Sequence, residues 1–278
     1  MSSNSAEPVP ERPVWHSRPR LCTRQVDDRS GKAQPRAAVP HIVLIGIDDT
    51  DNAESRGTGY LARQLLAHCA ALGCRPIGVT RHQFLVDPRI PYTSHNSGAC
   101  LAVETAGGVD SVRVAFDFVA RASAEGSDPG VCIVALEDVP AAVIEFGRRA
   151  TAEVLEIAEA MDLAAAAGIE LRPLGGTGQG VIGALGSVGL RAGGNDGRFI
   201  EWPGLRQLPE RVKSAELAEM GIGLDHRSDR RPGPDDIYET LGWLRPALVS
   251  GGPLWSVTWN EERNAWIPVD TKRSRPLE

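Results

Sequence analysis

The stretch IGIDDTDNAESRGTGYLARQLL, residues 45–66, decides how the rest of the chain is interpreted. It begins inside an apolar run, residues 41–47, whose β-branched residues predict a buried strand. Acidic residues and glycines follow this strand in quick succession: Asp48, Asp49, Asp51, Gly57 and Gly59. Carboxylates this close together repel one another, so their position at the end of a buried strand needs a physical explanation.

A helix is predicted directly after the acidic turn. Residues 58–73 carry apolar side chains at helical spacing and reach Gly73, which suits a C-cap. A helix N-terminus offers unpaired N–H groups, and glycines let a phosphate approach them closely. Carboxylate oxygens suit Mg²⁺, which would offset the repulsion among Asp48, Asp49 and Asp51. The pattern therefore predicts a site for Mg²⁺ and phosphate groups. A turn rich in helix-capping residues, with Thr58 as an N-cap, remains the alternative.

The remaining chain alternates between strand and helix patterns, which predicts an α/β (α+β) fold. Apolar runs predict strands at 75–86, 99–105, 131–138 and 199–202. Helical spacing predicts helices at 109–124, 141–167 and 181–190. The glycine-rich loop 174–180 precedes the last of these helices and repeats the first layout. It predicts a second phosphate contact through Gly178 and Gly180, with a flexible connector as the alternative.

Changes of composition divide the chain into three parts. Residues 1–38 are rich in Pro, Ser and Arg and are predicted to be a disordered tail. Residues 39–225 form the predicted core. Residues 226–278 begin with a charged, proline-rich linker and continue as a small β unit that holds four of the six tryptophans. Aromatic packing explains these tryptophans better than a base-stacking platform does.

The composition limits the classes of function. A formal net charge of −6 argues against a protein that coats nucleic acid, although a local basic patch remains compatible with it. The sequence shows neither an apolar run long enough to cross a bilayer nor the apolar segment of a signal peptide, so a soluble, cytoplasmic protein without a membrane partner is expected. Its five cysteines form no C-x-x-C pair, and Cys69 and Cys132 are expected to be small buried hydrophobes.

Three sequence blocks resemble one family in the same order along the chain. The first is IGIDDTD with the Thr and Tyr that follow it, the second is DPRIPYTSHNSGA at 87–99, and the third is QGVIGALGSVG at 179–189. Together, over residues 42–202, they resemble the core of the tRNA-isoleucine agmatinylcytidine synthetases of archaea. That family uses ATP and Mg²⁺ to activate a tRNA cytidine. The resemblance implies a kinase-like α/β core with a ferredoxin-like part.

The resemblance also implies roles for individual residues. Asp48, Asp49 and Asp51 would surround the metal and the phosphates, and Thr58 would be the threonine that becomes phosphorylated. The catalytic set is therefore Thr58, Asp49 and His95, with His95 as a phosphate contact or general acid or base. The nucleotide-binding set is Gly57, Gly59, Ser94, Asn96, Gly98, Gly178 and Gly180.

The chain departs from the family in ways that bear on its substrate. Gly59 replaces a second threonine, and the basic residues of the second block give way to Thr93 and His95. The chain contains three lysines, and the cysteines of the family's zinc ribbon are missing. The prediction is therefore an ATP-dependent ligase-like or kinase-like enzyme with an unidentified, non-tRNA acceptor, or one that relies on a partner protein to bring RNA.

Two other interpretations remain open. A degenerate nucleotide-binding or regulatory module without catalysis is one of them. The other is a phosphatase of the haloacid-dehalogenase type, which matches Asp49 and Asp51 as an Asp-x-Asp pair. That class would require Thr80, Lys213 and the pair at 235–236 in further roles, and their sequence surroundings suit those roles poorly.

Overall fold

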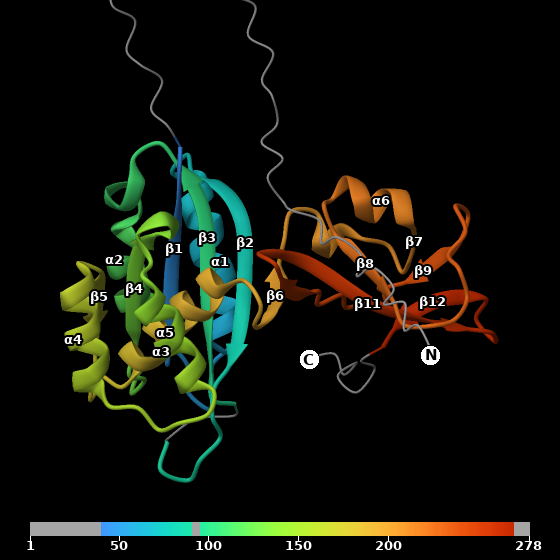
Figure 1. The fold of residues 1–278 in the computed structure, drawn as a ribbon. Coiled ribbons are helices and arrows are strands. Elements are labelled where there is room, and N and C mark those ends of the chain that lie inside the picture. Colours follow the sequence, from blue (N-terminus) through green and yellow to red (C-terminus); the bar gives the residue numbers. More distant parts are fainter. Residues whose placement is uncertain (1–39, 91–94, 270–278) are drawn as a thin grey trace, which may run out of the picture. The chain divides into compact units, whose positions relative to one another are not determined.

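The structure, a computed structural model, describes residues 40–90 and 95–269. Its contacts group residues 38–278 into one compact unit. The predicted tail, residues 1–38, lies outside the described residues. The predicted fold class is confirmed, since helices cover a mixed sheet that contains 12 strands in the described part of the chain (Figure 1).

The first half of the unit has the β-α-β-β-α-β order of a ferredoxin-like fold. Its elements are β1 (His41–Asp48), α1 (Thr58–Ala71), β2 (Arg75–Gln83), β3 (Ser97–Thr105), α2 (Val114–Ala122) and β4 (Gly130–Ala135). The strands lie in the order β4-β1-β3-β2, and every neighbouring pair is antiparallel. A haloacid-dehalogenase-like phosphatase is disfavoured, because a parallel sheet around the acidic strand is absent in these pairings.

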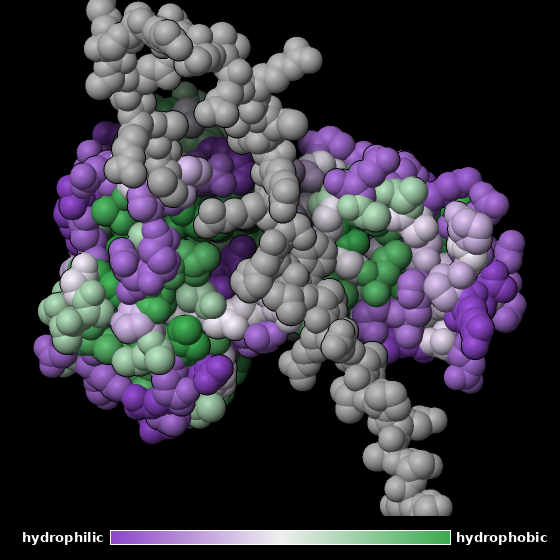
Figure 2. Space-filling model, turned by 45° about the horizontal axis from the view of Figure 1, so that its top comes forward, coloured by the Kyte–Doolittle hydropathy of each residue, from purple (hydrophilic) through white to green (hydrophobic). Residues whose placement is uncertain are grey.

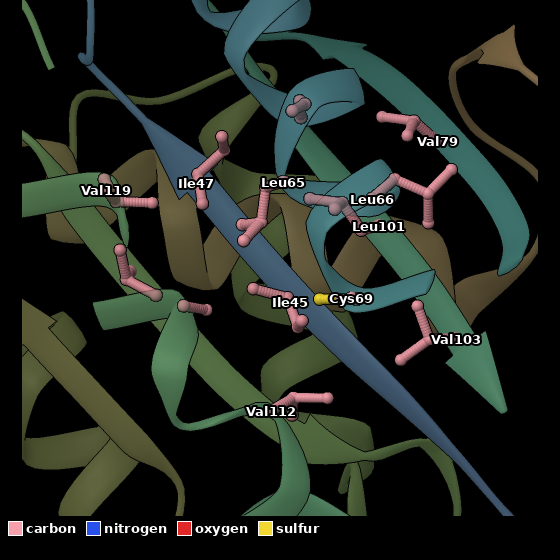
Figure 3. Close-up of a cluster of buried hydrophobic side chains, with 14 of the residues drawn as sticks. Ile45, Ile47, Leu65, Leu66, Cys69, Val79, Leu101, Val103, Val112 and Val119 are labelled. Atoms are coloured by element: carbon pink, nitrogen blue, oxygen red, sulfur yellow. The ribbon is translucent and has the colours of Figure 1, made fainter. Parts of the chain in front are cut away.

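Helices α1 and α2 cover one face of this sheet. Ile45 and Ile47 of β1 point toward Leu65, Leu66 and Cys69 of α1 (Figure 3). These side chains alternate along β1 and recur at helical spacing along α1, as the sequence pattern predicts. The expected burial of Cys69 and Cys132 is confirmed. The helix ends with Leu72 as its C-cap, and Gly73 follows with a φ of +92°.

Three helices cover the opposite face: α3 (Ala141–Ala150), α4 (Ile157–Ala167) and α5 (Gly180–Gly193). The prediction of one helix over 141–167 is wrong, because the chain leaves the helix between residues 150 and 157. Leu155 in this connection is buried in the same core, and Arg149 bonds to Glu153 and Glu159 across it. A single helix of that length would span about 40 Å and could not fold back on the sheet.

The sheet continues on both sides of the ferredoxin-like part. β5 (Glu170–Pro173) pairs with β4, and β6 (Arg198–Glu201) pairs with β2 and β10. Further strands and one helix complete the C-terminal β unit: β7 (Arg211–Lys213), α6 (Ser214–Glu219), β8 (Gly223–His226), β9 (Ile237–Glu239), β10 (Ala247–Val249), β11 (Gly252–Asn260) and β12 (Ala265–Pro268).

The C-terminal β unit has its own hydrophobic core. Trp255 and Trp266 are buried in it, and Trp259 packs against it, which favours aromatic packing over an exposed stacking platform. This core begins at Leu205, so it includes residues that precede the expected boundary at 226. Residues 225 and 226 belong to β8, which pairs in parallel with β11, rather than to a linker.

Short 3-10 helices at Gly108–Val112, Leu136–Asp138 and Leu205–Gln207 account for smaller differences from the predicted boundaries. On the face shown in Figure 2, hydrophobic residues lie between hydrophilic ones. None of the helices in the described ranges has the length and apolar character needed to cross a membrane.

Candidate functional site

Three aspartates line a cavity of about 360 Å³ at the end of β1. Asp48 is the last residue of the strand, and Asp49 follows with a φ of +52°. Few residues other than glycine adopt this left-handed conformation, and such residues are often found at functional sites. Asp51 completes the acidic side of the cavity. The structure therefore brings the predicted carboxylates to one site.

The surroundings of two of these carboxylates favour their protonated forms. Burial, with the negative charges of Asp49 and Asp51, raises the pKa of Asp48 to about 7. Burial, with the charges of Asp128 and Asp51, raises the pKa of Asp49 to about 6. A bound cation would reverse this effect, because it stabilises the ionised carboxylates.

The connection between α3 and α4 forms another wall of the cavity. Glu153, Leu155 and Glu156 come from the residues that interrupt the predicted long helix. The first turn of α5 provides a further wall through Gln179 and Gly180. The break between α3 and α4 therefore has a consequence for the site, since it supplies a cavity wall that one straight helix would not.

Helix α5 packs directly against the acidic strand end. A Cβ on Gly183 would lie 1.7 Å from Oδ2 of Asp48, so the carboxylate occupies the space that any other residue's side chain would need. Val181 and Ala184 of the same helix are fully buried. Small residues in α5 thus allow its N-terminal end to approach the carboxylates closely.

Thr58 reaches the cavity through Asp51. Its Oγ1 donates a hydrogen bond to Oδ1 of Asp51 at 2.8 Å and accepts one from the hydroxyl of Thr50 at 3.1 Å. The residue is only 6% exposed. The helix N-cap is Gly57, and Thr58 is the first helical residue, so the alternative of Thr58 as an N-cap is wrong. Asp51 is positioned to accept the proton of this hydroxyl.

Asp128 holds the glycine-rich loop that precedes α5. Its carboxylate accepts hydrogen bonds from the N–H of Thr177 at 2.9 Å and of Gly178 at 2.6 Å, and from the hydroxyl of Thr177. Its backbone carbonyl accepts the N–H of Gly180, and its own N–H donates to the carbonyl of Asp49. The N–H groups predicted to contact a phosphate are therefore bound to Asp128 in this structure.

The second sequence block lies at the rim of the cavity. His95 is exposed and lines the cavity, as do Asn96 and Ser97. The amide of Asn96 donates to the carbonyl of Leu85 at 2.6 Å and so holds the chain beyond β2. Ser94 lies outside the described residues.

The predicted glycines differ in position. Gly98 is buried, and a Cβ there would lie 2.4 Å from Oγ of Ser187 in α5. A Cβ on Gly59 would meet Ile200, and one on Gly57 would lie 3.8 Å from Asp51. Gly98 and Gly59 therefore serve close packing, and Gly57 lies nearest the acidic group.

The donor set fits a magnesium ion only in part. Three carboxylates offer the oxygen ligands that Mg²⁺ prefers. Within the part of the chain that the structure describes, however, no group of three or more His, Cys, Asp or Glu side chains is arranged so that it could hold a metal ion. Magnesium is commonly held by one or two carboxylates, substrate phosphates and waters. Asp49 and Asp51 fit that second type of site.

Two residues next to the carboxylates were not predicted from the sequence. The positive charge of Arg81 in β2 offsets a small part of the rise that burial causes in the pKa of Asp48, and the guanidinium donates to the hydroxyl of Ser97. Asp128 was missed because it stands in a loop 80 residues after Asp48. The sequence signal that could have indicated Asp128 was its position between a polar loop and the strand predicted to begin at 131.

Comparison with known proteins gives the following relatives. The isoleucine-tRNA 2-agmatinylcytidine synthetases TiaS of Pyrococcus horikoshii and Methanosarcina mazei are each 31% identical to this chain over 156 residues. The match covers 53% of this chain and 35% of each relative. The TiaS of Thermococcus sibiricus is 27% identical over 151 residues. The chain thus spans about a third of the length of these relatives.

Solved structures give matches of similar extent. A tRNA fluorescent labeling enzyme is 30% identical, with a TM-score of 0.48, over 53% of this chain and 36% of that chain. A complex of TiaS with isoleucine tRNA and ATP is 29% identical, with a TM-score of 0.46, over 54% of this chain and 36% of that chain. A scan against protein-family models gives no match. By sequence identity, this chain is homologous to the tRNA agmatinylcytidine synthetases TiaS over about half of its length.

Proposed function

We propose that the chain binds ATP with Mg²⁺ in the cavity beside Asp49 and transfers a phosphoryl group or activates an oxygen of an acceptor. The observation that carries this proposal is the meeting of Asp48, Asp49 and Asp51 with the N-terminal end of α5 around one cavity. The sequence relation to TiaS, which has been solved with ATP, supports ATP as the nucleotide.

Four residues at or beside the cavity have roles that suit phosphoryl transfer, which depends mainly on positioning and on neutralisation of charge. Asp49 and Asp51 would hold Mg²⁺, which would neutralise negative charge on the phosphates when bound. Asp51 would also accept the proton of Thr58, if Thr58 takes up a phosphate. His95 lies at the exposed rim, where an acceptor would enter.

Two features define what binding would require. Thr58 is buried, so a phosphate could reach its hydroxyl only if the residues around Asp51 open. The N–H groups of Gly178 and Gly180 are bonded to Asp128, so a phosphate that used them would have to displace it. These features also support the second candidate function, a nucleotide-binding module without catalysis.

The acceptor is proposed to be a small molecule rather than a tRNA bound by this chain alone. The chain carries a net charge of −6 and contains three lysines, whereas phosphate contacts supply much of the affinity for nucleic acid. An RNA brought by a partner protein would be compatible with the same cavity. We also propose that the protein is located in the cytoplasm.

Calorimetric titration with ATP in the presence of MgCl₂ tests nucleotide binding. Asp49→Asn removes the charge and suits the backbone, since Asn adopts positive φ angles more readily than most residues. We expect its affinity for ATP to fall at least tenfold. Asp110→Asn is the matched control, because its side chain is 75% exposed on the 3-10 helix Gly108–Val112 and does not line the cavity. Equal ATP affinity in wild type and Asp49→Asn would refute the proposed metal site.

A second measurement separates an enzyme from a binding module. The protein is incubated with ATP and Mg²⁺, and mass spectrometry then locates any phosphate while chromatography follows ADP and AMP. Phosphate on Thr58, absent from Thr58→Val, would support a kinase-like enzyme. Binding of ATP without turnover or modification, also in the presence of candidate acceptors, would favour the module.

A further inference from the structure

A second cavity, of about 560 Å³, lies on the face of the sheet that α1 covers. It shares no lining residue with the cavity beside Asp49. Residues from α1, β2 and the segment after β6 line it: Arg63, Leu66, Ala67, Arg75, Pro76, Gly78, Glu201, Trp202 and Pro203. Its size is typical of cavities that hold small ligands.

The indole of Trp202 forms a rigid wall of this cavity. Its Nε1 donates to the carbonyl of Met220 at 2.7 Å, and Phe199 packs edge-on with ring centroids 5.0 Å apart. A Cβ on Gly78 would lie 3.2 Å from the indole and 2.7 Å from the carbonyl of Glu201, so glycine permits this close packing. Because its polar group is already bonded elsewhere, the indole offers the cavity only an aromatic surface.

Apolar groups complete the same cavity. Leu66 is 5% exposed and belongs to the core beneath α1, where Figure 3 shows it among the buried side chains. Ala67, Pro76 and Pro203 add small or flat apolar surfaces. A flat ring would therefore contact apolar groups as well as the indole face.

The charge at this cavity is positive, in a chain that is negative as a whole. Arg63 donates a hydrogen bond to the carbonyl of Gly59 at 3.2 Å, and within the described ranges no ion pair joins it to a carboxylate, although the negative charge of Glu201 acts on it. The nearby Glu201 is bonded to Arg206 at 3.0 Å. Arg75 is bonded to Glu104. Burial and the positive charge of Arg206 lower the pKa of Arg63, and the negative charge of Glu201 offsets only part of this effect.

We propose that this cavity binds a small planar aromatic molecule that carries one negative charge, a carboxylate or a phosphate. The ring packs against Trp202 and the apolar wall, and the anionic group bonds to Arg63. A guanidinium pairs well with either anion, because its N–H groups match their oxygens. The chemical class follows from the two groups that converge on the cavity, an aromatic face and a partly buried cation.

The test compares two probes that share one ring system and differ in whether their substituent is charged. Binding of 2-naphthoate and of the neutral 2-naphthamide is measured by calorimetry on the full chain. We expect 2-naphthoate to bind with at least tenfold higher affinity. Arg63→Met should remove this difference, because it keeps much of the side-chain length without the charge. Arg148→Met, on the exposed surface of α3, is the matched control and should leave both affinities unchanged.

A second variant blocks the cavity without removing a charge. Ala67 is exposed on α1 and lines the cavity, so Ala67→Phe should fill it and abolish binding of both probes while the protein remains folded. Absence of saturable 2-naphthoate binding at millimolar concentrations would overturn the proposal. Binding that survives both Arg63→Met and Ala67→Phe would also overturn it, because it would show an adventitious site elsewhere. The nucleotide proposal is unaffected by either result, since the two cavities share no residue.

Discussion

Replacement of Gly183 by alanine tests whether the position of Asp48 depends on the close approach of α5. The added Cβ would lie 1.7 Å from Oδ2 and 2.4 Å from Cγ of Asp48. Carbon and oxygen atoms that are not bonded do not approach this closely, so the carboxylate or the helix must move by more than about 1 Å. Both are held by the surrounding core, because Val181 and Ala184 are fully buried.

The expected loss of stability combines three effects. Overpacking of a core costs about 1–3 kcal/mol. Displacement of a hydrogen-bonded, buried carboxyl group costs about another 1–3 kcal/mol. Alanine in a helix interior recovers about 1 kcal/mol relative to glycine. We therefore expect Gly183→Ala to lower the free energy of unfolding by roughly 1–5 kcal/mol.

Urea unfolding followed by circular dichroism measures this change. The control is Gly193→Ala in the same helix, where the new Cβ would meet only a terminal methyl of Ile144 at 3.1 Å. That variant should be neutral or slightly more stable. In the background of Asp48→Ala, Gly183→Ala should cost less, because the clashing carboxylate is gone and only the contact with Cβ of residue 48, at 2.9 Å, remains. Equal costs of Gly183→Ala with and without Asp48 would refute the reasoning.

Three further predictions concern neighbouring groups. Asp128→Ala should lower the free energy of unfolding by about 1–3 kcal/mol. Inorganic phosphate should raise the melting temperature of this variant more than that of wild type, because the N–H groups of Thr177 and Gly178 become available to it. An equal rise in the two proteins would contradict an anion site at this loop. Burial lowers the pKa of His82, so the native state resists its protonation, and stability should fall as pH drops below 6.5. The same fall in His82→Gln, measured by urea unfolding at several pH values, would assign it to other groups. Thr58→Val should lose about 1–2 kcal/mol, and Thr58→Ser should lose less, because serine keeps the bond to Asp51.

The strands and the position of the acidic turn could be predicted from the sequence because they depend on local patterns. A continuous apolar run defines β1, and helical spacing defines α1, so their bounds agree with the structure within a few residues. The break between α3 and α4 could not be predicted in this way. Residues 151–156 contain no glycine or proline, and the chain turns there because Leu155 is buried and Arg149 pairs with Glu153 and Glu159.

The candidate site was predictable only where its residues are adjacent in sequence. The carboxylates beside β1 form a local motif, so their meeting at one cavity agrees with the sequence. Asp128 is far from that motif, and its bonds to the loop at 177–178 arise from the antiparallel pairing of β4 with β5. From the sequence alone, the N–H groups of Gly178 and Gly180 were expected to be available to a phosphate. A local pattern does not reveal that a distant residue, Asp128, accepts their hydrogen bonds.

Helix α1 connects the two proposed sites, and its packing determines whether they influence one another. Its first residue, Thr58, bonds to Asp51 at the acidic cavity, and Arg63 and Leu66 line the second cavity one to two turns later. A ligand at the second cavity could alter the first by moving this helix or β2, which carries Gly78 at the second cavity and Arg81 beside Asp48. The buried face of α1 is held against the sheet by a continuous core, and such cores resist small displacements. Since coupling requires a ligand to favour one of two helix positions, and the packing favours a single position, we expect the two affinities to be independent.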